Sequence, residues 1–173
     1  SVEFVLPLAN GRYGLSGGIG GRDLHRVGGG TGQVRTGGAT FAWRPAPHTE
    51  VLLFAADFAM RSEEARPTLY PLAGAVPSRM ERGVDLGQRW TGRNSDTLNL
   101  GGIAKLPLGG LRLEAGLFYT RRGYQQVFAD ILAGVASDGS VAARRIVADG
   151  GTSDGSLSGE LRLVWQRRFV HFD

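Results

Sequence analysis

Residues 95–124 read SDTLNLGGIAKLPLGGLRLEAGLFYTRRGY, two runs of alternating apolar and polar side chains joined at residues 107–110. A period of two is typical of strands, because successive side chains point to opposite faces. Each run is roughly ten residues long, whereas a globular strand averages about five or six and a bilayer-crossing strand needs about 9–11. The segment therefore predicts an antiparallel hairpin of membrane-spanning length. Its apolar face is expected to comprise Leu98, Leu100, Ala104, Leu106, Leu111, Leu113, Ala115, Leu117 and Tyr119.

The composition excludes several other kinds of protein. The 173 residues include 28 glycines and no cysteine, so disulfide frameworks and thiolate metal sites are impossible. No apolar run reaches the roughly 18 residues of a transmembrane helix. Lys105 is the only lysine among 20 basic residues, and the arginines form no basic stripe, which argues against nucleic-acid binding. If the chain enters a membrane, it must do so in a closed barrel, because lipid cannot pair an open sheet edge.

The hairpin pattern recurs along the chain. Alternation predicts strands over about 2–6, 12–20, 33–43, 50–60 and 155–166, and an eighth strand beginning near Phe169. Short connections are expected near 7–11, 44–49, 107–110 and 166–168, and long ones near 21–32, 61–94 and 121–154. Within the last of these, residues 127–135 and 141–147 are expected to form a small hairpin around 137–140, or short helices. Short turns at one end and long loops at the other are typical of outer-membrane barrels. We therefore predict an all-β fold, an antiparallel up-and-down meander of about seven to eight strands in which residues 1–173 form one segment of a transmembrane β-barrel.

Charged and aromatic residues assign the two faces of this sheet. A basic side chain facing the mid-bilayer costs about 2–4 kcal/mol, so the face of each strand that carries charged residues should point to the barrel interior. In the strand near 50–60, the parity of Leu52, Phe54 and Phe58 is expected to face lipid. The expected interior-facing residues are Asp57, Asn99, Lys105, Arg112, Glu114, Glu160 and Arg162. The expected aromatic residues at the two membrane interfaces are Tyr13, Trp43 and Trp165 at the short-turn end and Phe58 and Tyr119 at the other.

The sequence offers few groups for bond chemistry. The three histidines, His25, His48 and His171, have no partner at metal-ligand spacing, so neither a metal site nor a cofactor is expected. Asp23 and His25 lie near the loop end of a strand, which leaves a rim-site hydrolase as a minor alternative. We expect no enzyme activity. Candidate ligand-binding residues, which could attract an anionic ligand or lipopolysaccharide phosphates, are the loop arginines Arg61, Arg66, Arg79, Arg82, Arg121, Arg122, Arg144 and Arg145.

Several stretches resemble one family. Residues 41–51, FAWRPAPHTEV, resemble the strand–turn–strand element of TonB-dependent outer-membrane receptors, particularly the siderophore-receptor branch. The segment 71–77, PLAGAVP, is similar to the long extracellular loop that follows it. Residues 138–171 are similar to the next loop and hairpin.

The resemblance implies an outer-membrane receptor of a Gram-negative cell that imports ferric siderophores or similar large nutrients. Its partners would be outer-membrane lipid and lipopolysaccharide, the nutrient ligand, and the TonB complex through a plug region. The plug domain is absent from the chain and about 22 strands are typical of the family, so we expect a fragment of a larger barrel. The alternatives are a self-contained eight-strand barrel with a structural or adhesive role, the rim-site hydrolase, and a soluble β protein.

Overall fold

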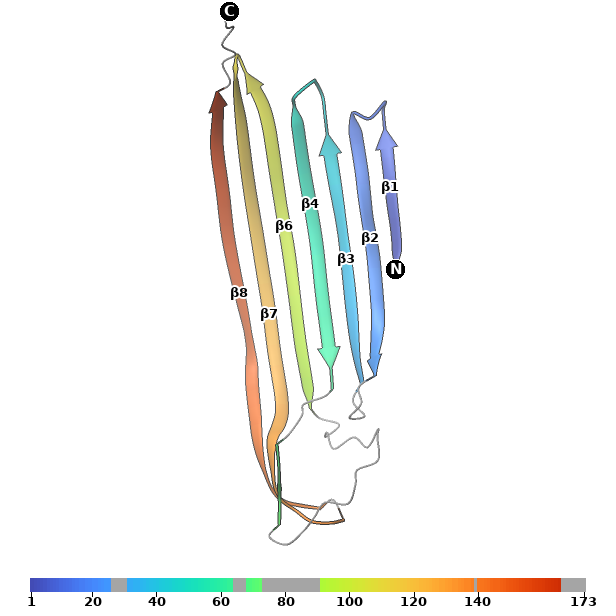
Figure 1. Ribbon diagram of the computed structural model, residues 1–173, viewed down its shortest axis with the longest axis vertical. Helices are drawn as coiled ribbons and strands as arrows, with labels where there is room; N and C mark the ends of the chain where they lie inside the picture. Colours follow the sequence, from blue (N-terminus) through green and yellow to red (C-terminus); the bar gives the residue numbers. More distant parts are fainter. Residues whose placement is uncertain (26–30, 64–67, 73–90, 139, 166–173) are drawn as a thin grey trace, which may run out of the picture.

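The chain folds into one long, curved, mostly antiparallel sheet (Figure 1). The computed structural model describes residues 1–25, 31–63, 68–72, 91–138 and 140–165. Seven strands follow one another in sequence order across the sheet, each antiparallel to the last. These strands are β1 (Val2–Leu8), β2 (Tyr13–His25), β3 (Thr31–Trp43), β4 (Glu50–Ser62), β6 (Gly92–Leu108), β7 (Leu111–Val135) and β8 (Val141–Trp165).

The prediction of an all-β, antiparallel meander is confirmed. The described residues contain no helix long and apolar enough to cross a bilayer. Within the described part of the chain, β1 and β8 form the two edges of the sheet and do not pair with each other. The sheet is therefore open, and its membership of a barrel stays a prediction.

Tight turns connect the strands at one end of the sheet. The β6–β7 hairpin turns at Gly109 and Gly110, whose φ angles are +54° and +88°. Two successive positive φ angles suit a two-residue hairpin turn, and glycine adopts them without a steric penalty. The predicted turn at residues 107–110 is thus confirmed, with Pro107 and Leu108 belonging to β6.

The predicted long loop at residues 121–154 is wrong. β7 continues to Val135, and β8 begins at Val141 and pairs with it along its whole length. Register shifts occur between Tyr124 and Gln126 and between Ala129 and Ile131. Polar residues and glycines at 121–126 and 149–155 interrupt the alternation of apolar and polar side chains, whereas backbone hydrogen bonds form regardless of side-chain type. The alternative of a hairpin turning near 137–140 is confirmed.

The far end of this hairpin carries its own small core. β5 (Thr68–Pro71), within the segment expected to be a loop, adds to β7 as a parallel strand. Leu132 and Val135 are 4% and 3% exposed and pack against Leu69 and Val141. The long hairpin is therefore braced by a segment that lies more than 50 residues earlier in the chain.

We expect the turn at the tip of this hairpin to loosen at acidic pH. The Ser140 amide donates a hydrogen bond to Asp138 Oδ1 at 2.9 Å, which lowers the pKa of the Asp138 carboxyl. Because the pKa of Asp138 is lower in the folded chain, the hydrogen bond stabilises the turn fully above the carboxyl's ordinary pKa. This stabilisation is lost as pH falls through the lowered pKa. Hydrogen exchange of the Ser140 amide should therefore accelerate below that pH, relative to the intrinsic rate, in the native chain. Asp138→Asn should weaken this pH dependence, and an unchanged profile in that variant would contradict the assignment.

Candidate functional site

A row of alternating charges crosses four strands near the short-turn end. Residues directly opposite each other in antiparallel strands place their side chains on the same face. Glu50 of β4 lies opposite Lys105 of β6, and Lys105 lies opposite Glu114 of β7. Glu114 in turn lies opposite Arg162 of β8. Because neighbouring charges differ in sign at every step, each charged side chain in the row attracts the side chain opposite it on the adjacent strand.

Ion pairs join this row to charges on the same face. Lys105 Nζ lies 3.8 Å from Glu50 Oε2, and Arg162 Nη1 lies 3.6 Å from Glu114 Oε2. Arg112 Nε approaches Glu114 Oε1 at 2.9 Å. Two further pairs, Arg44–Glu50 at 2.7 Å and Arg162–Glu160 at 2.5 Å, extend the row. We call these residues (Arg44, Glu50, Lys105, Arg112, Glu114, Glu160 and Arg162) the charged row.

The register shows which residues share a face with the charged row. Asn99 lies on that face and accepts a hydrogen bond from the Thr120 hydroxyl at 2.9 Å. Six residues expected to face the interior therefore share one face, namely Asn99, Lys105, Arg112, Glu114, Glu160 and Arg162. That this face encloses a lumen stays a prediction.

For β4, the expected assignment of faces is wrong. Asp57 lies opposite Leu98 and Gly37 and shares the apolar face, whereas Phe58 lies opposite Thr97 on the face of the charged row. Both parities of β4 are apolar over most of its length, so the sequence pattern gives no preference. Pairing of Glu50 with Lys105 fixes the register of β4 against β6. This register determines the face on which every other β4 side chain lies.

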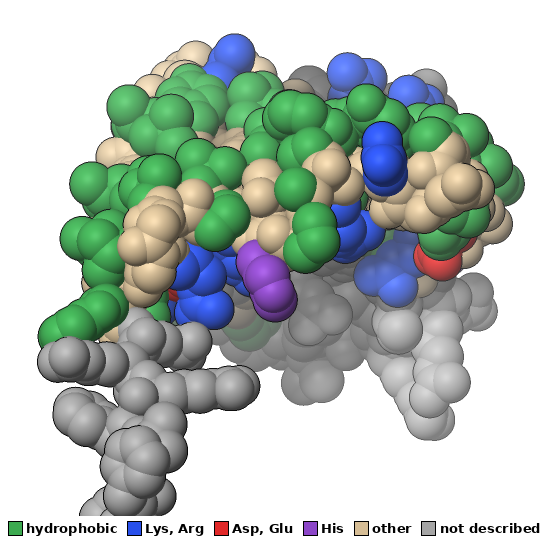
Figure 2. Space-filling model, turned by 90° about the horizontal axis from the view of Figure 1, so that it is seen from above, with side chains coloured by type: hydrophobic (Ala, Val, Ile, Leu, Met, Phe, Trp, Pro, Cys, Tyr) green, Lys and Arg blue, Asp and Glu red, His purple; other side chains and the backbone are tan. Residues whose placement is uncertain are grey.

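The opposite face is apolar over a height that suits a membrane. From Leu111 to Tyr119, β7 presents only apolar or aromatic side chains on this face, over about 26 Å along the strand at about 3.3 Å per residue. Hydrophobic side chains cover much of the outer, convex surface of the sheet, and Lys and Arg side chains lie beneath the arch and also on parts of the outer surface (Figure 2). Tyr13 lies opposite Trp43, and Trp165 lies opposite Leu111, all at the short-turn end. Tyr119 lies on the same face, opposite Leu157.

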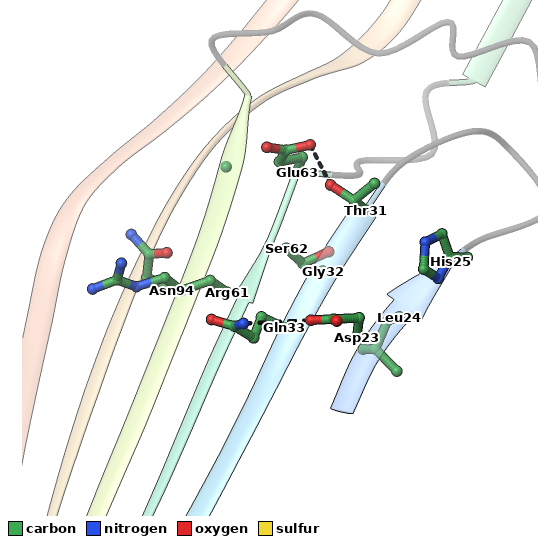
Figure 3. Close-up of a pocket in the computed structure, with 11 residues that line it drawn as sticks. Asp23, Leu24, His25, Thr31, Gly32, Gln33, Arg61, Ser62, Glu63 and Asn94 are labelled. Atoms are coloured by element: carbon green, nitrogen blue, oxygen red, sulfur yellow. Dashed lines mark hydrogen bonds between the residues drawn. The ribbon is translucent and has the colours of Figure 1, made fainter. Parts of the chain in front are cut away.

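A polar pocket of about 450 Å³ lies where β2, β3, β4 and β6 reach the loop end (Figure 3). The Gln33 amide donates to Asp23 Oδ1 at 3.4 Å, and the Thr31 hydroxyl donates to Glu63 Oε2 at 2.6 Å. Arg61 lies opposite Gln33 and Asn94 lies opposite Arg61, so these side chains share a row with Asp23. The row belongs to the apolar face, because Asp23 is ten residues from Tyr13 along β2.

Asp23 and His25 line this pocket, and the hydrogen bond that Asp23 accepts comes from Gln33. Both lie on the convex face, away from the charged row. Ser62, which also lines the pocket, is on the opposite parity and is buried. Among the residues that the structure describes, no group of three or more His, Cys, Asp or Glu side chains could hold a metal ion.

The loop arginines proposed from the sequence do not gather at one place. Arg66, Arg79 and Arg82 lie outside the described residues. Arg121 and Arg122 are neighbours on β7 and so point to opposite faces. Arg144 and Arg145 lie opposite Leu132 and Ile131, about 33 Å further along the hairpin at 3.3 Å per residue.

Arg35 was not singled out by the sequence reasoning, although the register brings it into the row next to Arg61, on the same convex face. Arg35 could have been found from the sequence, because it is an even number of residues from Phe41 and Trp43 and therefore lies on the same face of the strand.

No protein-family model, curated protein or solved structure matches the chain.

Proposed function

We propose that the chain forms part of the wall of an outer-membrane β-barrel that imports large nutrients. The observation that carries the proposal is the division of one long curved sheet into an apolar convex face and a concave face bearing the charged row. A globular sheet of this size would bury its apolar face in a core. Here Leu117, Leu157 and Leu161 are 58%, 69% and 75% exposed, which suits contact with lipid chains.

The orientation follows from the ends of the sheet. Aromatic rings favour the headgroup level, and Tyr13, Trp43 and Trp165 sit at the short-turn end of the apolar face. Beyond the apolar height at the other end, β7 and β8 continue as a hairpin that begins with a polar stretch, residues 121–126 of β7 opposite 149–155 of β8. In an outer-membrane barrel the short turns face the periplasm and the extended hairpins face outward.

Closing the barrel requires further strands. An unpaired strand edge in lipid leaves its backbone groups without partners, at a cost of several kcal/mol for each group. In the described part of the chain, β1 and β8 each have one unpaired edge, so their partners must come from strands beyond this sheet. This requirement favours a segment of a larger barrel over a self-contained eight-strand one.

The finer proposal is a TonB-dependent receptor for ferric siderophores or similar nutrients. It rests on the resemblance of residues 41–51 and the segments after it. In such a receptor the loop-end hairpins would bind the nutrient, and passage through the lumen would follow remodelling of a plug by the TonB complex. The chain would contribute shape and polar groups and no bond chemistry.

Spin labels can test which face meets lipid, because the chain contains no native cysteine. We expect a label at Leu117→Cys, on the convex face, to collide with dissolved oxygen and to be shielded from a water-soluble nickel complex in bilayers. A label at Thr120→Cys, on the concave face of the same strand, should show the opposite preference. The measurement is power-saturation electron paramagnetic resonance of the complete barrel protein in outer-membrane vesicles, with the label in this segment, because the proposal requires strands beyond this sheet to close the barrel.

The accessibility of the two labels to nickel and oxygen decides whether the convex face contacts lipid. Equal access of nickel to both labels would mean that the convex face lies in water, as in a soluble β protein. Oxygen preference at Thr120 and nickel preference at Leu117 would mean that the sheet is inside out. Either outcome would overturn the barrel-wall proposal.

A further inference from the structure

The loop-end part of the β7–β8 hairpin extends beyond its neighbour β6. β6 pairs with β7 as far as Val127, which lies opposite Gly92 at the start of β6. β7 continues to Val135 and pairs there with the first residues of β8, from Val141 onward. We call residues 128–147 the projecting hairpin. At about 3.3 Å per residue, its β7 strand reaches roughly 26 Å past the last pair with β6.

A third strand supports the projecting hairpin. Of the strands that the structure describes, only β5 pairs with this hairpin from outside it, and it runs parallel to β7 with Leu69 opposite Leu132. Leu72, directly after β5, donates its amide to the Val135 carbonyl at 3.0 Å. An isolated two-stranded hairpin is marginally stable in water, whereas three strands that share an apolar cluster can hold together. β5 therefore supplies the strand that the projecting hairpin needs to stay folded.

The apolar cluster of this region combines side chains from β5, β7 and β8. Leu132 and Val135 of β7 are buried, and Leu69 of β5 and Val141 of β8 pack against them. In the described part of the chain, Ala42 is the only other buried hydrophobic residue. Undocking of β5 would remove Leu69 from the cluster and expose apolar surface of Leu132 and Val135, so docking of β5 stabilises the hairpin.

The pairing of β7 with β8 is irregular where the projecting hairpin joins the rest of the sheet. The register shift between Tyr124 and Gln126 leaves Gly150 and Gly151 of β8 without a partner on β7. A Cβ at Gly150 would meet nothing within 4 Å, and Gly151 has a φ of +102°. Irregular pairing and sparse packing lower the free energy needed to open a segment locally. The projecting hairpin can therefore open without opening the strands below it.

Hydrogen bonds at the rim of the sheet keep β5 close to the projecting hairpin. The Glu63 amide donates to the Thr31 carbonyl at 2.9 Å, and the Thr31 hydroxyl donates to Glu63 Oε2 at 2.6 Å. The Thr91 hydroxyl donates to the Glu63 carbonyl at 2.7 Å, which joins the two ends of the segment that carries β5. The chain from Glu63 to Thr68 can reach at most about 18 Å. An undocked β5 would therefore stay near β7, where redocking is an intramolecular event.

We propose that β5 is a latch that controls whether the projecting hairpin is folded. With β5 docked, residues 128–147 belong to a three-stranded unit with its own apolar cluster. With β5 undocked, these residues lose their order as far as the irregular pairing at Gly150 and Gly151, while the rest of the sheet stays folded. The inference does not depend on the proposed function. In the proposed barrel wall, the latch would switch the hairpin at the outer rim between an ordered and a disordered state.

Hydrogen–deuterium exchange mass spectrometry of the complete protein in nonionic micelles can test the latch. In Leu69→Ala, we expect the amides of residues 131–147 to exchange at least about tenfold faster than in the native protein, because the lost leucine methyl groups stabilise the unit that must open for exchange. Exchange in residues 111–120, which lie in the same strand below the irregular pairing, should not change.

Two further variants separate docking of β5 from other effects of the substitution. Tyr70→Ala removes a larger side chain from the same strand, but Tyr70 is 54% exposed and alternates with Leu69, so exchange should stay within about twofold of the native rate. Tyr70→Cys with Ala133→Cys places thiols on register partners about 4.8 Å apart at Cα, which suits a disulfide. In the Leu69→Ala background, this disulfide should restore slow exchange, and its reduction should abolish the recovery.

Four results would overturn the inference. Unchanged exchange in Leu69→Ala would mean that the hairpin is ordered without β5, and equally fast exchange in Tyr70→Ala would mean that the cluster around Leu69 is not the cause. Acceleration that extends to residues 111–120 would mean that the whole sheet, and not a separate unit, has lost stability. Fast exchange in the disulfide-linked form would mean that docking of β5 does not order the hairpin.

Discussion

Replacing Gly101 with alanine is expected to destabilise the sheet by about 1–3 kcal/mol, the usual range for forcing a side chain into filled space. Gly101 lies on β6 between the rings of Phe54 on β4 and Phe118 on β7. A Cβ at this position would lie 2.5 Å from Phe54 ring atoms and 2.8 Å from Cδ1 of Phe118. The ring centroids are 6.1 Å apart, so an added methyl group must displace both rings.

The measurement is the free energy of unfolding in urea of the refolded chain in nonionic micelles. Gly92→Ala is the matched control on the same strand, because a Cβ at Gly92 has no neighbour within 4 Å. Its effect should stay within about 0.5 kcal/mol, as for a substitution that touches nothing. Phe54→Leu in the Gly101→Ala background should recover part of the lost stability by making room for the methyl group.

This experiment also tests the register. The sequence pattern put Phe54 on the face of Leu113 and Leu161, in which case its ring could not reach Gly101. Equal stabilities of the Gly101→Ala and Gly92→Ala variants would contradict the pairing of Phe54 with Gly101. A loss of stability in Gly101→Ala but not in Gly92→Ala, partly restored by Phe54→Leu, would support the pairing.

The central hairpin and the meander were predictable because their signals are local. Alternation in β6 and β7 is clean, and the Gly109–Gly110 turn carries its own conformational requirement. β4 lacks such a signal, since Val51, Leu53 and Ala55 are as apolar as Leu52 and Phe54. Its faces are set by non-local contacts with β3 and β6, which one sequence does not contain.

The candidate sites were less predictable for the same reason. The charged row combines residues from four strands, and only the parity of its members is visible in the sequence. Arg35 and Arg61 become neighbours only when the β3–β4 register is known. Of the loop arginines that the sequence made conspicuous, Arg61 lies beside Arg35, whereas the others lie outside the described residues or apart from one another.

Reversing the charge at the centre of the charged row should have the second large effect. Glu114 is 21% exposed, with Arg112 and Arg162 on two sides and Lys105 directly opposite. Glu114→Lys would remove two ion pairs and place a fourth cation among three. Exposed pairs contribute about 0–1 kcal/mol each and like charges oppose each other by similar amounts, so we expect a loss of about 2–3 kcal/mol at low salt.

Controls separate the electrostatic effect from packing. Glu160→Lys reverses a charge that pairs with Arg162 at the edge of the sheet, where Glu160 is 62% exposed, and should have a smaller effect. Arg162→Glu combined with Glu114→Lys restores one pair with its signs exchanged and should recover part of the stability. The free energy of unfolding of all three variants is measured in low salt and in about 1 M salt, where the screening length falls to about 3 Å.

The salt dependence decides the cause. If the charged row acts through attraction between neighbouring strands, high salt should shrink the difference between Glu114→Lys and the native chain. A loss of equal size at both salt concentrations would mean that the longer side chain disrupts packing on the concave face. Recovery by Arg162→Glu at low salt, and not at high salt, would show that the alternating signs themselves hold β7 and β8 in register, which places the stabilising charges on the face that the proposed barrel keeps away from lipid.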